Sequence, residues 1–219
     1  MSKVIRTFGS WIVLIGAICS VCYGQGCKWS GTEGWNSSLR DVIPDCGFVL
    51  LSPNGLLRLS VSPSGAMSLR RTSQPAKGKW RGPKLEPPAK ISWSPNSDSF
   101  FVDDGDGSGL TSSFRLFRVK GFESSEDRSI EQAAVFLYRQ LTHCDSSSAD
   151  PNVWGFGWGE KGSKIFLLVQ ATVDEPCGRA DEFMGLVVRT SDGMVLESLS
   201  KAQMKERFSS LLPPSMWSD

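Results

Sequence analysis

Short runs of apolar and alternating residues, separated by turn residues, dominate the chain. Gly, Pro, Asn, Asp and Ser divide these runs at the short spacings of an antiparallel meander. The run at 114–119 alternates in part, as a strand with one solvent-exposed face does, whereas 165–169 is continuously apolar and indicates a strand buried on both faces. The predicted strands are 47–51, 56–61, 66–70, 90–93, 99–103, 113–119, 153–158, 164–173, 183–189 and 194–197.

Two segments have the pattern of helices instead. The first begins at 129–132, where Ser, Glu and Gln have the spacing of a helix start. The second covers 200–212 and ends before two consecutive prolines, which cannot continue a helix. The apolar positions of the first recur at helical period, at Ile130, Ala133, Ala134, Leu137 and Leu141.

A short turn sequence occurs three times. It reads LSPNG at 51–55, WSPNS at 93–97 and, in degenerate form, WGEKG at 158–162. A strand-like run follows each copy at the same offset. The repeat therefore indicates a recurring strand-turn-strand unit, not a recurring catalytic loop.

The segment 91–119 resembles the blade repeat of TolB-like and WD40-like β-propellers. In that repeat a Trp or Phe precedes Ser-Pro-Asp-Gly, an apolar strand and an acidic loop. Residues 93–96 and 100–102 match, Ser97 replaces the expected Gly, and the units at Phe48 and Phe156 are weaker copies. The resemblance covers about half of the chain beyond residue 24. It implies a protein or ligand platform outside the cytoplasm and carries over no active site.

The resulting fold class is mainly β, an antiparallel meander with propeller-like blade repeats and two peripheral α-helices. A blade takes about 40 residues and a closed propeller needs at least four blades. The chain has room for roughly three to four blades, so the sheets need not close into a ring.

The N-terminal segment has the pattern of a secretory signal. Lys3 and Arg6 precede an apolar run at 11–22, and small residues follow around Gly24, so we expect cleavage after Gly24. An uncleaved membrane anchor is the alternative, but about 14 apolar residues are fewer than the roughly 20 that a spanning helix needs. A lipid anchor on Cys27 is a further alternative, which Gln25 disfavours. Residues 25–219 then form a single β-rich domain in the periplasm or outside the cell, without a membrane span.

Cleavage leaves Cys27, Cys46, Cys144 and Cys177, an even number in an oxidising compartment. Two disulfides are expected, and of the three connectivities we favour Cys27 with Cys46 and Cys144 with Cys177, because each closes a modest loop. A zinc site is the weaker alternative, because no two of these cysteines have the two-residue spacing and the chain has one His, His143.

Charge argues against a nucleic-acid partner. The formal net charge is +1, whereas a dedicated nucleic-acid binder relies on a basic face that neutralises phosphates. Basic residues nevertheless gather in a Pro-rich segment, 70–90, that we expect to be a loop or arm. Trp80 is the tryptophan that we expect to be exposed, because Trp93 and Trp158 hold equivalent repeat positions that favour core packing. The arm is either a solvated loop or a site for an acidic partner, such as lipid headgroups or an acidic protein, which would bind through Trp80, Lys77, Lys79, Arg81 and Lys84.

A calcium loop is the main cofactor candidate. Asp104, Asp106 and Ser108 place oxygen atoms at alternate positions between glycines, a pattern that can wrap a hard cation. Arg115 occupies the twelfth position, where a helix-loop-helix calcium site requires an acid. A solvated hairpin loop without cofactor is therefore the preferred interpretation.

Two groups of residues could serve catalysis. His143 has Cys144 and Asp145 beside it, but a nucleophile, its base and the group that orients the base must converge in space, which adjacent residues seldom do. The second group is a set of acids around Cys177 that could supply the paired carboxylates of a glycosidase. Its members are Asp174, Glu175, Asp181 and Glu182.

Taken together, these patterns favour an exported, non-enzymatic binding or scaffold protein of the cell envelope. Its propeller-like surface would contact a protein or another envelope component. The alternative is a secreted hydrolase that acts on carbohydrate or ester substrates.

Overall fold

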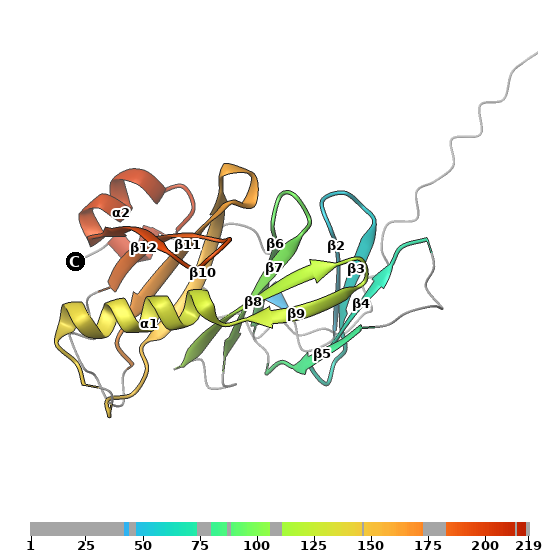
Figure 1. Ribbon diagram of the computed structural model, residues 1–219, viewed down its shortest axis with the longest axis horizontal. Coiled ribbons are helices and arrows are strands. Elements are labelled where there is room, and N and C mark those ends of the chain that lie inside the picture. The colour runs from blue at the N-terminus through green and yellow to red at the C-terminus, as the bar shows by residue number, and fades with distance from the viewer. Residues whose placement is uncertain are drawn as a thin grey trace, which may run out of the picture.

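The computed structural model describes residues 42–43, 47–73, 80–86, 89–105, 111–145, 147–172, 183–212 and 214–217. Within these ranges the strands form three antiparallel sheets of four, five and four strands (Figure 1). Each sheet is a meander of strands consecutive in sequence, apart from one added edge strand. The signal segment 1–24 lies outside the described residues.

The first sheet has the order β2-β3-β4-β5. Buried and unburied residues alternate strictly along β3, where Leu57, Leu59 and Val61 are buried and the residues between them are not. This alternation gives the sheet one core face and one outward face. The strands are β2 (Phe48–Leu51), β3 (Leu57–Val61), β4 (Ala66–Arg71) and β5 (Trp80–Lys84).

The second sheet has the order β1-β6-β7-β8-β9. Residues 99–103 of β7 are all buried, because this sheet lies between the other two and both of its faces are covered. The strands are β1 (Val42–Ile43), β6 (Ala89–Trp93), β7 (Ser99–Gly105), β8 (Ser112–Lys120) and β9 (Glu123–Asp127).

The third sheet has the order β10-β11-β12-β13 and follows helix α1 (Ser129–Thr142). Its strands are β10 (Asn152–Gly159), β11 (Lys164–Gln170), β12 (Phe183–Arg189) and β13 (Val195–Leu199). A 3₁₀ turn, η1 (Glu160–Gly162), joins β10 to β11. Helix α2 (Lys201–Phe208) and a second 3₁₀ turn, η2 (Pro214–Trp217), follow β13.

Three hydrophobic clusters hold these layers in a row. The first lies between the first and second sheets, and the second joins the second sheet to α1 and the third sheet. In the third cluster, Met204 and Phe208 of α2 pack on the far face of the third sheet. Figure 1 shows the result as an arc with α2 at one end and the first sheet at the other.

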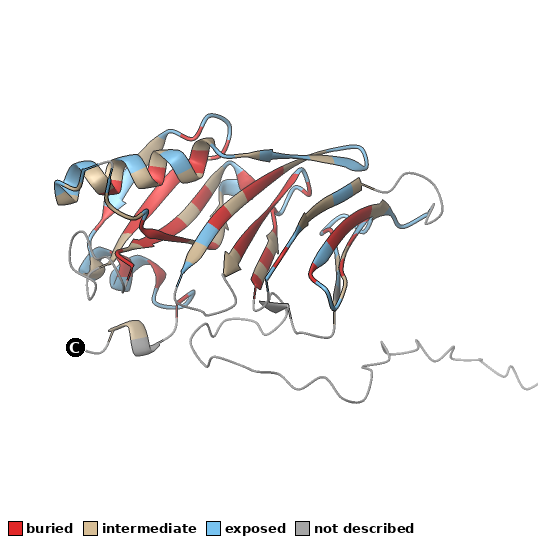
Figure 2. Ribbon diagram, turned by 90° about the horizontal axis from the view of Figure 1, so that it is seen from below, coloured by how far each residue is buried: buried red, intermediate tan, exposed pale blue. Residues whose placement is uncertain are grey.

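The outer faces of the first and third sheets explain why the described sheets do not form a ring. Closure would require the first and third sheets to present apolar faces to further blades. Helix α2 already covers the third sheet, and on the two central strands of the first sheet the outward positions include the polar residues Arg58, Ser60, Ser68 and Arg70. Figure 2 shows which residues of the structure are buried and which are exposed. The predicted fold class, mainly β with propeller-like meanders and two helices, is confirmed. None of the described helices has the length and apolar character needed to cross a membrane.

The repeated turns have the structural role that the sequence predicted. In the first, Ser52 Oγ accepts the Leu57 N–H at 3.0 Å and donates to the Leu57 carbonyl at 3.3 Å. Ser94 repeats this arrangement with Ser99, at 3.1 and 2.9 Å. Each serine is buried and closes its own hairpin.

Ser97, which replaces the glycine of the repeat, has a specific contact. It has a φ of 65°, in the left-handed region that its counterpart Gly55 also occupies at 71°. The Asn54 N–H of the neighbouring turn donates to Ser97 Oγ at 3.1 Å. A hydrogen bond between the turns of the first and second sheets thus offsets the conformational strain of a non-glycine residue.

The predicted arm at 70–90 is wrong in part. Strand β5 lies inside it and pairs with β4, with Trp80 opposite Leu69. The sequence obscured this strand because Gly82 and Pro83 interrupt it, at a point where the pairing with β4 is irregular.

The helices differ slightly from their predicted bounds. Ser129 is the first residue of α1, and it donates both its N–H and its hydroxyl to Asp127 Oδ1, at 3.0 and 2.7 Å. Helix α2 is shorter than 200–212, and Ser200 and Gln203 cap its start reciprocally. Strand β9 was missed, because its charged and serine-rich sequence lacks apolar alternation.

Candidate functional site

The outward face of the first sheet gathers basic side chains, and we call it the basic face. Cross-strand partners point to the same side of a sheet, so the register defines this face. Arg58 of β3 is opposite Arg70 of β4, Ser68 is opposite Arg81 of β5, and Ala66 is opposite Lys84. The outward positions of the four strands are Val49, Leu51, Arg58, Ser60, Ala66, Ser68, Arg70, Arg81 and Lys84.

These positions carry four cations and no carboxylate among them. Arg58, Arg81 and Lys84 are exposed. Arg70 is half buried opposite Arg58, so the exposed charge of this face lies at Arg58, Arg81 and Lys84.

Apolar side chains border the basic face along β2. Val49 is 45% exposed and Leu51 is 53% exposed, both on the outward side. Leu56, in the turn between β2 and β3, is 66% exposed. The face therefore changes from aliphatic at β2 to cationic across β3, β4 and β5.

The structure separates the residues of the predicted binding arm. Trp80 points to the opposite side of the sheet, where its ring meets Phe100 and Phe117 edge-on at centroid distances of 6.4 and 5.7 Å. Trp80 was expected to be exposed, but its side chain is half buried and packs against the first core cluster. Arg81 and Lys84 do lie on the basic face, and Lys77 and Lys79 lie outside the described residues.

Sequence reasoning missed Arg58 and Arg70. The signal that could have found them is the alternation around β3, where Arg58 and Ser60 stand between buried Leu57, Leu59 and Val61. The alternation of buried and polar residues along β3 places Arg58 on the solvent-facing side of the sheet. Only the pairing register between β3 and β4 places Arg70 beside it.

The proposed calcium ligand Asp104 has protein partners. Arg115 Nη1 lies 3.5 Å from its Oδ2, and the Glu86 N–H donates to its Oδ1 at 3.0 Å. Burial raises the pKa of Asp104, against the hydrogen bond from Glu86 and the charge of Arg115. Arg115 also forms a bidentate pair with Glu126, at 3.1 and 2.6 Å. Asp106 and Ser108 lie outside the described residues, so the calcium loop stays a prediction.

A buried ionic clamp joins strands β6 and β7 of the second sheet to strand β10 of the third sheet. Asp103 of β7, 6% exposed, accepts the Gly155 N–H of β10 at 2.7 Å, and Lys90 of β6 donates to the Gly155 carbonyl at 3.2 Å. Burial raises the pKa of Asp103 to about 7, although Lys90 and the Gly155 hydrogen bond act to lower it. Gly155 has no room for a side chain, since a Cβ would lie 2.7 Å from the ring of Phe101. The clamp holds the N–H and the carbonyl of Gly155 between the Asp103 carboxyl group and the Lys90 ammonium group.

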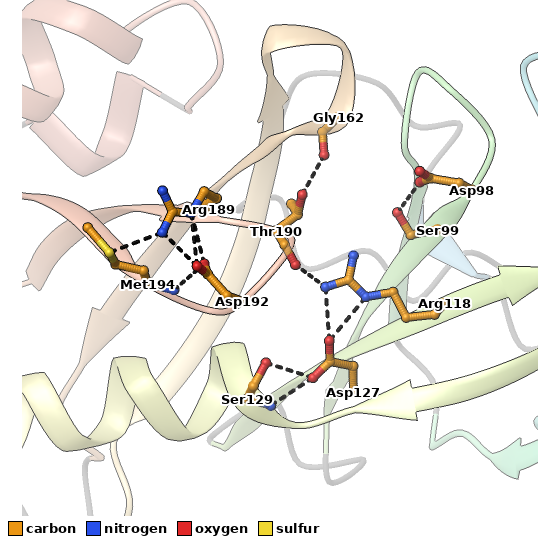
Figure 3. Close-up of polar contacts among 10 residues, drawn as sticks. All are labelled: Asp98, Ser99, Arg118, Asp127, Ser129, Gly162, Arg189, Thr190, Asp192 and Met194. Atoms are coloured by element: carbon orange, nitrogen blue, oxygen red, sulfur yellow. Dashed lines mark hydrogen bonds and ion pairs between the residues drawn. The ribbon is translucent and has the colours of Figure 1, made fainter.

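A second polar network joins the same sheets at their other end (Figure 3). Arg118 of β8 donates to Asp127 Oδ2 from Nε at 3.1 Å and from Nη2 at 2.9 Å, and to the carbonyl of Thr190. Thr190 Oγ1 in turn donates to the Gly162 carbonyl at 2.9 Å. Burial acts to raise the pKa of Asp127, but hydrogen bonds from Ser129 and Arg118 outweigh it and the pKa is lowered. The network fixes α1 and the turn at η1 to the second sheet.

The residues considered for catalysis are not brought together in the described part of the chain. His143 is exposed just after α1, with a left-handed φ of 58°. Cys144 is half buried beside Thr142, whose Oγ1 lies 2.9 Å from its sulfur. Cys27, Cys46 and Cys177 and the acids Asp174, Glu175, Asp181 and Glu182 lie outside the described residues. The disulfide pairing therefore stays a prediction.

Comparison with known proteins gives no family. No family model and no curated protein matches the chain. Among solved structures, a protein from Lactobacillus plantarum is similar at 12% identity and a TM-score of 0.37, over 70% of this chain and 41% of that one. A proposed 6-phosphogluconolactonase from Bacteroides fragilis is similar at 11% identity and a TM-score of 0.38, over 73% of this chain and 40% of that one. The chain spans about two-fifths of the length of these proteins, and likeness at this level says nothing of activity.

Proposed function

We propose that this chain is an exported, non-enzymatic binding or scaffold protein of the cell envelope, whose basic face contacts an acidic envelope component or protein. The observation that carries the proposal is the segregation of charge. The whole chain has a formal net charge of +1, yet the outward positions of the described first sheet hold three exposed cations, Arg58, Arg81 and Lys84, and no acid. Such a face attracts anionic partners and orients them.

Export is proposed from the sequence. The basic start, the apolar run at 11–22 and the small residues near Gly24 support a cleaved signal. The four cysteines beyond residue 24 support an oxidising destination. We further propose that the meanders are blades of the TolB-like or WD40-like kind, which serve as binding platforms.

Export predicts that the mature chain contains no free thiol. The secreted or periplasmic protein should begin at Gln25 by mass spectrometry. Thiol labelling under denaturing, non-reducing conditions should leave all four cysteines unmodified. Two or more labelled cysteines per chain would contradict the pairing.

Binding is tested with the mature chain immobilised and exposed to a solubilised envelope fraction. The matched variant carries Arg81→Glu and Lys84→Glu, both at exposed positions of the basic face. The proposal expects a component that the native chain retains, that the variant loses, and that high salt releases. Equal retention by both proteins would show that binding, if any, occurs elsewhere.

A further inference from the structure

We infer that the open edge of β2 binds an extended peptide segment of a partner protein as an additional antiparallel strand. The repeated turns make β2, β6 and β10 equivalent, because each is the first strand of its meander and leads into one copy of the turn sequence. Each of these strands has one edge paired with the next strand of its meander and a second edge that faces away from it. The three strands differ in what lies at this second edge.

In β6 and β10 the second edge has a partner within the chain. The short strand β1 pairs antiparallel with β6, opposite Ala89 and Lys90. On β10, Asp103 of the second sheet accepts the Gly155 N–H at 2.7 Å, and Lys90 donates to the Gly155 carbonyl at 3.2 Å. A strand therefore covers one of the equivalent edges, and charged side chains bond to another.

The second edge of β2 has no strand beside it in the part of the chain that the structure describes. Ser52, directly after β2, donates its N–H to the Leu57 carbonyl at 3.0 Å. Bonded and non-bonded pairs alternate in an antiparallel ladder, so Leu50 bonds to β3, whereas the backbone groups of Val49 and Leu51 point to the open edge. The N–H and carbonyl groups of these two residues are available to an added strand.

Strand β2 also lacks the residues that protect sheet edges. Charged side chains and proline normally keep an open edge from pairing with another chain. The edge strand β9 has the charged sequence ESSED, and the edge strand β5 contains Arg81, Pro83 and Lys84. Strand β2 has the sequence FVLL, and its outward side chains, Val49 and Leu51, are exposed. This edge therefore favours pairing with a further strand.

An extended peptide fits the edge better than a second copy of the chain does. Antiparallel pairing of two β2 strands would join two basic faces in one sheet, with Arg58, Arg81 and Lys84 of both copies on the same side. Like charges brought together at an interface oppose association. Strand β2 would also contribute only four residues per copy, whereas a stable interface between proteins takes about 20 to 30 residues a side.

The pairing defines the chemistry of the peptide. An added strand gains affinity from its main-chain hydrogen bonds and specificity from alternate side chains. Its residues beside Val49 and Leu51 would place their side chains on the same side of the sheet as these two exposed aliphatic groups. A segment with apolar residues at alternate positions therefore fits best.

The test begins with random peptides displayed on phage and selected on the immobilised mature chain. We expect enriched sequences that carry apolar residues at alternate positions over the length of a strand. A synthetic copy of the most enriched peptide should bind in fluorescence anisotropy. Methylation of the peptide nitrogens that face β2 should weaken binding at least about tenfold, because it removes the donors of the added ladder. Enrichment of no sequence, or binding that methylation does not affect, would overturn the inference.

Amide hydrogen exchange locates the bound peptide. In the free chain the Val49 and Leu51 amides, which face the open edge, should exchange rapidly, whereas the Leu50 amide should exchange slowly because it bonds to β3. Saturating peptide should slow exchange at Val49 and Leu51 at least about tenfold. A peptide that binds without protecting these two amides binds elsewhere, and the inference is then wrong.

Matched variants complete the test. Val49→Lys with Leu51→Lys places protective charges at side chains that already face solvent, and it should weaken peptide binding at least about tenfold. The control, Phe136→Lys with Leu141→Lys, introduces the same residues at exposed apolar positions of α1 and should bind as the native chain does. Urea unfolding verifies that each variant is folded. Equal binding by the native chain and both variants would contradict a site at β2.

The remaining outcomes separate this inference from a second copy and from the proposed function. If the chain is a dimer in sedimentation equilibrium and Val49→Lys with Leu51→Lys makes it monomeric, a second copy occupies the edge and the peptide inference is wrong. The inference goes beyond the proposed acidic partner and does not depend on it. Arg81→Glu with Lys84→Glu changes the opposite edge strand, β5, and should leave peptide binding unchanged, so each proposal can fail without the other.

Discussion

The buried carboxyl group of Asp103 predicts an unusual dependence of stability on pH. Its pKa is raised from 3.8 to about 7 in the folded protein, chiefly by burial. Between about pH 4 and pH 7, Asp103 therefore keeps its proton in the folded state and loses it in the unfolded state. The contribution of Asp103 to stability is therefore fully present below about pH 4 and is lost as the pH rises through 7. The shift of about three pKa units corresponds to roughly 4 kcal/mol.

Replacing Asp103 with Asn tests this reasoning directly. The amide has nearly the same shape, and its oxygen can still accept the Gly155 N–H, but it does not ionise. The free energy of unfolding, measured by urea denaturation, should differ little between the two proteins at pH 4. From pH 4 to pH 8 the variant should gain roughly 3 to 4 kcal/mol relative to the native chain.

Asp127→Asn provides a control of opposite sign. The pKa of Asp127 is lowered in the folded protein, because hydrogen bonds from Ser129 and Arg118 outweigh burial. Its contribution to stability is present above the unfolded pKa and is lost as the pH falls. This variant should flatten the loss of stability in acid and leave the change between pH 5 and 8 intact. Parallel pH profiles for Asp103→Asn and the native chain would refute the assignment of Asp103.

Three other changes test the architecture. Ser97→Ala should destabilise the fold by about 1 to 2 kcal/mol, because it keeps the left-handed backbone and removes the acceptor of the Asn54 N–H, whereas Ser97→Gly should destabilise it less; equal losses in thermal melts would contradict this. Trp93→Ala should destabilise by roughly 3 to 5 kcal/mol, because Trp93 is buried against Phe100 in the first core cluster, and a loss below about 1 kcal/mol would exclude a core role. Calcium should not raise the melting temperature, because Asp104 already contacts Arg115 and accepts the Glu86 N–H; a rise that Asp104→Asn abolishes would establish the metal site.

The sequence predicted strands correctly where apolar residues alternate or follow one another, and it missed strands that lack this pattern. Strand β12 was found with its bounds because Phe183–Arg189 is an almost continuous apolar run. Strand β9, with the sequence ESSED, carries no such signal and forms because β8 offers it a backbone partner and Arg118 pairs with Asp127. Strand β5 was missed for a different reason, because Gly82 and Pro83 are residues typical of turns.

The candidate site depended on pairing between strands. The sequence marked Arg81 and Lys84 as basic residues of a supposed arm and grouped Trp80 with them. Adjacent residues of a strand point to opposite sides of the sheet, so β5 turns Trp80 into the core and Arg81 outward. Arg58 and Arg70 join Arg81 only because β3, β4 and β5 are neighbours in one register.

By itself, the sequence determined the β-rich class, most of the strands, the start of α1 and the repeated serine turns, because alternation, turn residues and capping residues act over a few neighbouring positions. Only the tertiary structure decided that α2 covers the third sheet, that Asp103 is buried against Gly155 and that four cations share one face. These features join residues distant in sequence, and their energies depend on burial and register, which no local pattern encodes.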